Sequence, residues 1–148
     1  MPVQFELVTP ERLLVSQDVD MVVVPGTEGN FGVLPGHSPL ISTVPGRIVD
    51  IYMGGAIAER IFVVGGIAEV TPERCTVLAD EAMAPDSLDR AGLEAELQTV
   101  EGNLPSLREQ LGRATGTDRD RLAVELRGLE RQQSVASAKL QALADVNR

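Results

Sequence analysis

MGGAIAERIFVVGGI, residues 53–67, is an apolar segment bounded by two Gly-Gly pairs. Gly-Gly between apolar runs is typical of the two-residue turn of a β-hairpin, because such turns need positive φ angles. We therefore expect hairpins at 53–56 and at 64–67. The sequence VTPER occurs at 8–12 and again at 70–74, with a proline whose fixed φ suits a tight turn. Many short strands joined by such turns predict a β-sandwich or a flattened barrel.

Apolar residues alternate with polar ones along the chain up to about residue 84. A period of two places every second side chain on one face of a strand. The three clearest sets are Val3, Phe5 and Leu7; Val19, Met21 and Val23; and Val49, Ile51 and Met53. We expect each set to lie on one face of a strand in a β-domain that spans residues 1–84.

The apolar period changes in residues 85–148, which we expect to form a second domain. Two series advance in steps of four and three residues: Leu93, Leu97, Val100, Leu104, Leu107 and Leu111, then Leu122, Leu126, Leu129, Gln133, Ala136, Leu140 and Leu143. Such steps form the seam of a coiled coil. Because only a short polar loop around Gly116 joins the two series, the sequence predicts an α-helical antiparallel hairpin, packed seam against seam.

The first of these helices has two features that bear on its shape. Asp86 or Ser87 is the expected residue to cap its N-terminus. Pro105 removes one backbone hydrogen bond, and Gly102 and Asn103 come just before it. We therefore expect a kink near 102–105 within a seam that continues.

The charge of the chain restricts its partners. The net charge is −9, which argues against nucleic acid because phosphates require a basic patch. No apolar run approaches the roughly 20 residues that span a bilayer, and the first residues do not resemble a signal peptide. The second half is much richer in arginine than the first. A solvated helix surface explains these arginines, and docking on an acidic protein partner is the alternative.

Few residues in the sequence are suited to catalysis or to metal binding. One histidine and one cysteine cannot assemble the usual zinc site, and the single lysine, Lys139, is not part of a phosphate-binding loop. His37 and its neighbour Ser38 would point in different directions on a strand, so we expect no Ser-His-Asp arrangement. Cys75 alternates with apolar residues and is expected to be a buried small hydrophobe. We therefore expect no catalytic site, no cofactor and no metal.

Three segments together resemble the epsilon subunit of the rotary F-type ATP synthase, called delta in mitochondria. VPGTEGNFGVLPGHSPLI (24–41) resembles the loop-rich segment of that family, and FVVGGIAEVTPERCTVLADEA (62–82) resembles its last sandwich strands. FELVTPERLLVS (5–16) fits its first hairpin. The resemblance covers essentially the whole chain. It implies a sandwich of about ten strands followed by a two-helix hairpin.

The resemblance also implies a non-catalytic function and a set of partners. The family's subunit lies in the central stalk, where its sandwich contacts the gamma subunit and the c-ring and transmits rotation of the ring to the catalytic head. It implies a peripheral location at the cytoplasmic face of the bacterial inner membrane, reached only through partners. The C-terminal helices can inhibit ATP hydrolysis, with the alpha and beta subunits as further candidate partners. The residues expected at or near the c-ring and gamma contacts are Glu28, Asn30, Phe31 and His37, although Phe31 is equally expected in the sandwich core. Many relatives have an acidic residue where Asn30 stands.

A motif at the start of the first helix departs from the family pattern. Relatives that bind regulatory ATP carry an [I/L]DxxRA motif, which begins here with Leu88 and Asp89 and continues as Arg90 and Ala91. Gly92 occupies the arginine position, and Arg90 lies two residues early, roughly 200° away around the helix. We therefore do not expect regulatory ATP to bind.

Two classes of function remain open at this point. The first is the rotor subunit that the resemblance implies. The second is a free-standing ligand-binding β-domain whose helical hairpin drives oligomerisation. A small hydrolase is the least favoured class, because no acid, base and nucleophile can be assembled from these residues.

Overall fold

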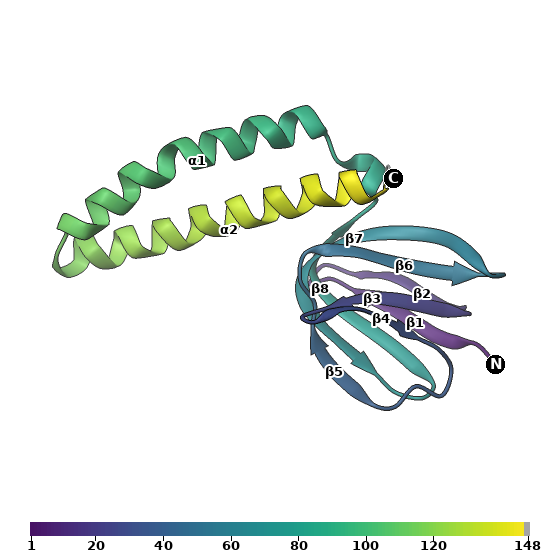
Figure 1. Ribbon diagram of the computed structural model, residues 1–148. Coiled ribbons are helices and arrows are strands. Elements are labelled where there is room, and N and C mark those ends of the chain that lie inside the picture. The colour runs from purple at the N-terminus through teal and green to yellow at the C-terminus, as the bar shows by residue number, and fades with distance from the viewer. Residues whose placement is uncertain (147–148) are drawn as a thin grey trace. The chain divides into compact units, whose positions relative to one another are not determined.

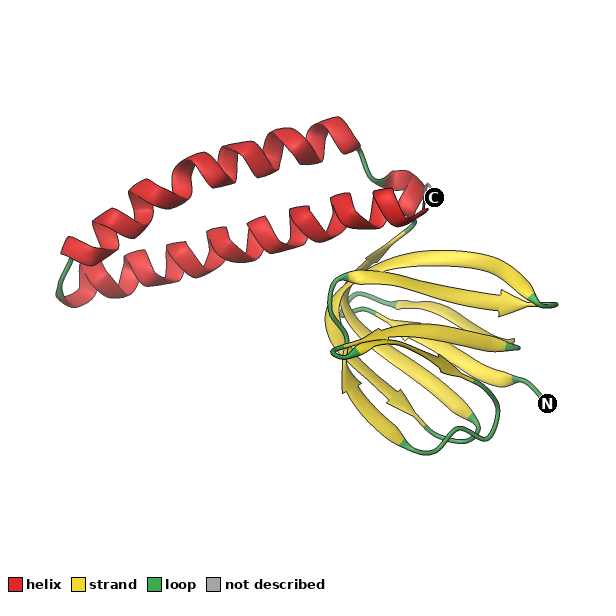
Figure 2. Cartoon of the chain, viewed as in Figure 1, coloured by secondary structure: helices red, strands yellow, loops and turns green. Residues whose placement is uncertain are grey.

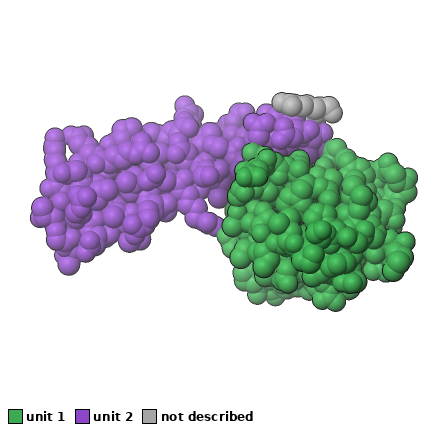
Figure 3. Space-filling model, turned by 60° about the horizontal axis from the view of Figure 1, so that its bottom comes forward, with its two compact units in different colours: residues 1–87 green, residues 88–148 purple. Residues whose placement is uncertain are grey.

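The computed structural model describes residues 1–146 of the chain (Figure 1). These residues belong to two compact units, Met1–Ser87 and a second that begins at Leu88, which are coloured separately in Figure 3. Figure 2 shows that the first unit is built mainly of strands and the second of helices. The two periods of the sequence therefore correspond to two units, each with its own secondary structure.

Eight strands form the first unit among the described residues. They are β1 (Val3–Val8), β2 (Leu13–Val19), β3 (Met21–Gly26), β4 (Gly29–Val33), β5 (Leu40–Thr43), β6 (Arg47–Met53), β7 (Ala56–Val70) and β8 (Arg74–Met83). The sheet order is β2-β1-β8-β7-β6-β3-β4, and β5 pairs with β7. All pairs are antiparallel except β1 with β8. The sheet folds over on itself around one core, which gives the predicted sandwich (Figure 1).

The two Gly-Gly pairs have different roles. Gly54 and Gly55 both have positive φ, 62° and 81°, and form the predicted turn between β6 and β7. The hairpin expected at 64–67 is wrong, because β7 continues through Gly65 and Gly66. There the strand changes partners, from β6 on its first part to β5 on its last part. Only glycine fits at Gly66, because its φ is 137° and an added Cβ would collide with the carbonyl oxygen of Leu78. One long bent strand thus takes the place of two short ones.

The repeated VTPER sequence forms the same turn twice, as predicted. Between β1 and β2, the backbones of Thr9 and Arg12 exchange hydrogen bonds of 3.0 and 3.2 Å. Between β7 and β8, the backbones of Thr71 and Arg74 exchange hydrogen bonds of 2.8 and 3.3 Å. In each case the proline follows the threonine, where its fixed φ suits the turn.

The core of the sandwich is mainly aliphatic. Val3, Phe5 and Leu7 are fully buried, as the alternation predicted, and so is Cys75. Burial raises the pKa of the Cys75 thiol to about 12, so this cysteine stays protonated at neutral pH and is unreactive. The other buried members of the core are Val19, Val22, Val24, Val33, Val44, Val49, Ile51, Ile61, Val63, Ala68, Val70, Val77 and Ala79.

The prediction that Val19, Met21 and Val23 share one face of a strand is wrong, because Val19 ends β2 and Met21 begins β3. Val22 and Val24 are fully buried, whereas Met21 and Val23 are only half-buried. The reason is Asp20, which lies between β2 and β3 and interrupts the alternation. Its N–H donates to the carbonyl of Tyr52 at 3.1 Å, and its carboxylate accepts the N–H of Gly54 at 2.7 Å. The alternation restarts one residue later on the far side of this turn.

Two long helices form the second unit, as predicted: α1 (Arg90–Arg113) and α2 (Gly116–Val146). They pack as an antiparallel hairpin. Every residue of the two predicted seams is buried or half-buried. The helix α1 continues through Pro105, and Figure 1 shows that it curves over its length. None of the helices in residues 1–146 is long and apolar enough to cross a membrane.

The start of α1 differs from the prediction. Pro85–Ser87 forms a short 3-10 helix, η1, and α1 begins later, at Arg90. Its N-cap residue is therefore Asp89 rather than Asp86 or Ser87, and the Asp89 side chain makes no capping hydrogen bond. The hydroxyl of Ser87 instead donates to the carbonyl of Ala84 at 2.7 Å.

Candidate functional site

The segment 24–41 presents two of the predicted contact residues at the end of a hairpin. β3 and β4 pair from Val22 with Val33 to Gly26 with Gly29, which leaves Thr27 and Glu28 as the turn. Gly29 has a φ of 122°, which L-residues rarely adopt. The Glu28 and Asn30 side chains are both exposed. A short, well-defined turn therefore holds these two polar side chains in solvent.

The other two predicted contact residues lie together. The rings of Phe31 and His37 are 6.5 Å apart between centroids, with their planes inclined at 42°. Phe31 also packs against the sandwich core, and a Cβ on Gly26 would come within 3.1 Å of its ring. His37 lies with its Nδ1 2.7 Å from the carbonyl oxygen of Ser38, which accepts a hydrogen bond from that nitrogen. The ring of Phe31 is therefore half-buried and reaches the core, while its contact with the gamma subunit or the c-ring stays a prediction.

A backbone hydrogen bond joins the loop between β4 and β5 to the turn between β7 and β8. The N–H of Gly36 donates to the carbonyl of Pro72, at 2.8 Å, in the turn between β7 and β8. The N–H of His37 donates to the carbonyl of Leu34 at 3.2 Å. These bonds restrict the loop between β4 and β5, although it contains no regular secondary structure.

The sandwich also has an exposed apolar surface that the sequence reasoning missed. Val8 pairs with Leu13 on one side and with Leu78 on the other, and Leu78 pairs with Ile67. These residues lie side by side across β2, β1, β8 and β7. Leu13, Leu78 and Ile67 are 55%, 47% and 45% exposed, and Ile41 on the neighbouring β5 is 73% exposed. We call Leu13, Val8, Leu78, Ile67 and Ile41 the apolar row.

The sequence did contain a signal for this surface. Leu78 directly follows Val77, so the two side chains belong to opposite faces of the strand that contains Cys75. Leu78 is an apolar residue on the otherwise polar outer face of β8, between Thr76 and Asp80. Large exposed apolar patches mark protein interaction sites, so the apolar row is the strongest candidate site on this unit.

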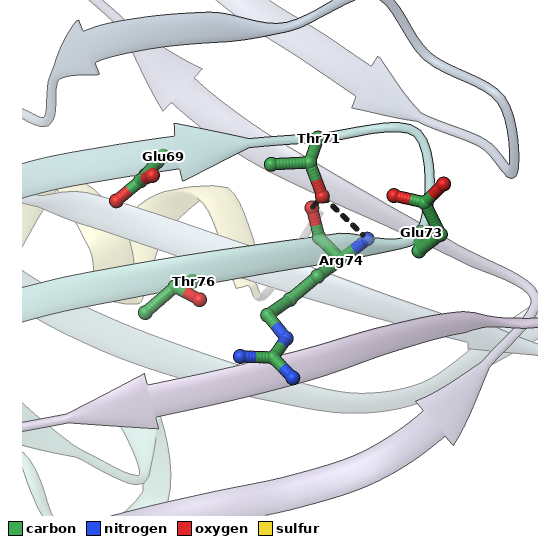
Figure 4. A pocket seen from close by; sticks show the side chains of 5 residues that line it. All are labelled: Glu69, Thr71, Glu73, Arg74 and Thr76. Atoms are coloured by element: carbon green, nitrogen blue, oxygen red, sulfur yellow. Dashed lines mark hydrogen bonds between the residues drawn. The ribbon is translucent and has the colours of Figure 1, made fainter.

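Carboxylates flank the apolar row at the end of β7 and β8. A hollow of about 300 Å³ is lined there by Glu69, Thr71, Glu73, Arg74 and Thr76 (Figure 4). Glu69 pairs with Ile41 on β5, and Thr76 lies two residues from Leu78 on the same strand. The hollow is therefore continuous with the apolar row.

Arg74, which lines this hollow, is directed toward β1. Its Nη2 donates to Oε1 of Gln4 at 3.3 Å, and its Nη1 lies 4.0 Å from Oε1 of Glu6. No ion pair within the described residues involves Glu69 or Glu73. The surface around the apolar row is therefore acidic, and it is suited to a partner that carries basic side chains.

Comparison with known proteins identifies the family of the chain. The family model described as "ATP synthase, Delta/Epsilon chain, beta-sandwich domain" matches residues 2–85. The chain is 48% identical over 123 residues to a protein of Rhodospirillum rubrum named "ATP synthase epsilon chain", which covers 83% of this chain and 92% of that one. The chain belongs to the ATP synthase epsilon family.

Another relative extends the epsilon-family match over the helices. A protein of Rhodospirillum centenum, also named "ATP synthase epsilon chain", is 48% identical over 143 residues, or 95% of this chain and 91% of that one. The epsilon chain is a non-catalytic subunit of the ATP synthase. Family membership therefore favours the first of the two predicted functions over a free-standing ligand-binding domain.

Two solved structures share the fold of this epsilon-family chain. One chain comes from the Euglena gracilis mitochondrial ATP synthase, described as "OSCP/F1/c-ring", with a TM-score of 0.66 and 17% identity over 99% of this chain and 82% of that one. The other comes from the Tetrahymena thermophila mitochondrial ATP synthase, described as "central stalk/cring", with a TM-score of 0.56 and 13% identity over 100% of this chain and 98% of that one. These likenesses confirm the sandwich followed by a helical hairpin.

The degenerate nucleotide motif of this family member lies at the start of α1. Leu88 is half-buried, whereas Asp89, Arg90 and Ala91 are exposed. A Cβ on Gly92 would come within 2.6 Å of Oδ2 of Asp89, so the carboxylate occupies the space where a side chain at residue 92 would begin. The first turn of α1 contains no acidic residue.

In one ion pair on the sandwich, the carboxyl group of Asp50 has a raised pKa. Arg60 Nε on β7 lies 3.3 Å from Asp50 Oδ1 on β6, and the two residues are cross-strand neighbours. Desolvation raises the pKa of Asp50, and the positive charge of Arg60 opposes that rise only in part.

Among the described residues, no group of three His, Cys, Asp or Glu side chains is placed to hold a metal ion.

Proposed function

We propose that this chain is a rotor subunit of an ATP synthase. It lies in the central stalk, contacts the gamma subunit and the c-ring, and transmits rotation of the ring to the catalytic head. The names of its relatives support this role, as do the descriptions of the two solved structures that share its fold. Its location is peripheral, at the cytoplasmic face of the bacterial inner membrane, and it reaches the membrane through its partners.

The gamma subunit binds the apolar row. This is the observation that carries the proposal: four neighbouring strands and β5 present apolar side chains to solvent in an otherwise acidic unit. Removing such side chains from water favours association, and part of that free energy offsets the freedom lost on binding. Glu69 and Glu73 at the end of the row require basic side chains opposite them. The facing surface of gamma is therefore apolar at its centre and basic at its edge.

The β3–β4 hairpin contacts the c-ring. Glu28 and Asn30 are exposed at its end, where they meet polar loops of the ring by hydrogen bonds. Phe31 and His37 act behind them, because their ring contact and the attachment of Phe31 to the core hold the hairpin in place. A turn that bends under load transmits torque poorly, so these two residues serve the coupling by stiffening the contact.

The helical hairpin inhibits ATP hydrolysis by leaving its closed arrangement and extending toward the catalytic head, where the alpha and beta subunits are further partners. This regulation proceeds without ATP bound to the chain itself. The presence of Gly92 in place of the family's arginine supports that part of the proposal, since a guanidinium is the usual partner for phosphate groups.

The test is co-purification of the full chain with its partners under mild detergent. The Ile67→Lys variant places a charge in the apolar row and should lose the gamma subunit. Met53→Lys is the matched control, because Met53 at the end of β6 is 44% exposed, close to the 45% of Ile67, and lies outside the row. If both variants retain gamma equally, the apolar row is not the gamma site. If the unmodified chain co-purifies with neither gamma nor a c-ring, the rotor function itself is wrong.

A further inference from the structure

The seam of the hairpin changes in character along its length. The amide of Gln132 donates to Oε1 of Glu96 at 3.0 Å, and this bond between the helices fixes their alignment. With the four-and-three steps of the two seams, it places the following positions level with each other: Leu107 with Leu122, Leu104 with Leu126, Val100 with Leu129, Leu97 with Gln133, and Leu93 with Ala136. We call residues 100–129 the turn half of the hairpin, and residues 90–97 with 133–146 its base.

The turn half is supported by contacts between the helices and by ion pairs within each helix. Aliphatic side chains meet at each of its three levels. The guanidinium of Arg119 on α2 donates to the carbonyl of Leu111 near the end of α1 at 3.2 Å. Each helix also has an ion pair near the turn, Arg113 with Glu109 at 2.7 Å and Arg121 with Glu125 at 3.7 Å. Such pairs support exposed helices modestly.

The seam of the base is less apolar than the seam of the turn half. Gln133 is half-buried and brings a polar amide into the seam, and Ala136 contributes little apolar area opposite Leu93. The start of α1 is also weak, because Asp89 makes no side-chain capping bond and the first turn holds Arg90 but no acidic residue. A basic residue at the positive end of a helix dipole is unfavourable. Two independent features, the seam and the uncapped helix end, therefore weaken the same end of the hairpin.

We propose that the hairpin opens from its base while the turn half stays closed, and that Gln133 marks the boundary between the two parts. This inference deepens the proposed function and rests on it in one respect: release of the base is then the step that frees the helices to inhibit hydrolysis. Gln133 is a positioning residue in this process. Replacing it with leucine completes the apolar seam and holds the base closed.

The experiment is amide hydrogen exchange on the full chain, followed by mass spectrometry, for the unmodified protein and two variants. Gln133→Leu should slow exchange in residues 90–97 and 133–146 about tenfold, the factor that corresponds to about half of the free energy of burying a leucine side chain. Exchange in residues 100–129 should change little. Gln98→Leu is the matched control, because it makes the same substitution at an exposed position one residue from the seam.

Two outcomes would overturn the inference. One is a Gln133→Leu effect no larger than that of Gln98→Leu. The other is equal slowing across both halves, which would mean that the hairpin opens as one unit. ATP hydrolysis by the assembled complex separates this inference from the proposed function, with Gln133→Leu expected to raise the rate. If exchange slows as expected and hydrolysis does not change, the boundary at Gln133 stands and the inhibitory role is wrong.

Discussion

Ile67 on β7 lies directly opposite Leu78 on β8, and both side chains are nearly half exposed on the outer face of the sheet. The next residue before Leu78, Val77, points the other way and is fully buried in the core. Two neighbouring apolar residues of one strand therefore serve different purposes. Val77 stabilises the sandwich, whereas Leu78 is available to a partner.

This difference predicts opposite results for two adjacent substitutions. Val77→Ala should lower the free energy of unfolding by about 2 kcal/mol, because it removes buried methyl groups and leaves a cavity. Leu78→Ala should change it by less than about 0.5 kcal/mol, since the side chain is half exposed, yet it should weaken binding to gamma. Urea denaturation followed by circular dichroism measures the first quantity and co-purification the second. Equal losses of stability would mean that Leu78 belongs to the core.

Gly66 should be among the least replaceable residues of the sandwich. Gly66→Ala would place a methyl group against the Leu78 carbonyl in a backbone conformation that alanine avoids, so we expect a loss of at least about 2 kcal/mol of unfolding free energy. Gly102→Ala is the opposite case. Gly102 lies inside α1 with open space around its Cα, and alanine there should stabilise the helix by about 0.5–1 kcal/mol. Urea denaturation measures the free energy of unfolding, which should fall for Gly66→Ala and rise for Gly102→Ala.

These glycines illustrate what the sequence could and could not predict. The change of period near residue 84 and the seam of the helices were visible, because side-chain periodicity follows directly from backbone geometry. The bend at Gly65 and Gly66 was not, since a Gly-Gly pair is compatible with either a hairpin or a bend, and the choice depends on which strands are neighbours. The apolar row was missed for the same reason. It is assembled from four strands and β5, which are brought together only by the register of the sheet.

The raised pKa of Asp50 beside Arg60 predicts how the contribution of this carboxyl group to stability depends on pH. Because the pKa of Asp50 is raised in the folded chain, its contribution to stability is fully present below its unfolded value of 3.8 and is lost as pH rises through the folded pKa. Arg60→Gln removes the charge that opposes desolvation and should raise the pKa of Asp50 further. NMR titration of the carboxyl carbon measures both values. A lower pKa in the Arg60→Gln variant would contradict the opposing effect of Arg60, and a pKa below 3.8 in the unmodified chain would contradict desolvation as the dominant cause.

Substitutions in the β3–β4 hairpin should distinguish a residue that stabilises the chain from a residue that couples proton flow to ATP synthesis. Glu28→Ala removes an exposed side chain, so we expect no change in the thermal unfolding of the isolated chain but weaker coupling of proton flow to ATP synthesis in membrane vesicles. Phe31→Ala should lower the unfolding free energy by about 1–2 kcal/mol, because its ring is half-buried against the core. Normal coupling in the Glu28→Ala variant would exclude this side chain from the ring contact.

Removal of the second unit tests which functions belong to the sandwich and which to the helices. The first unit ends at Ser87 and has its own core, so a chain that stops there should fold and bind gamma. We expect the truncation to change ATP hydrolysis more than ATP synthesis, because in the proposed function the helices block rotation in one direction, whereas the sandwich carries the torque in both. Circular dichroism of the truncated chain and both activities of the reconstituted complex provide the measurements. An unfolded truncated chain would show that the sandwich depends on the helices, and equal effects on the two activities would contradict a direction-specific inhibitor.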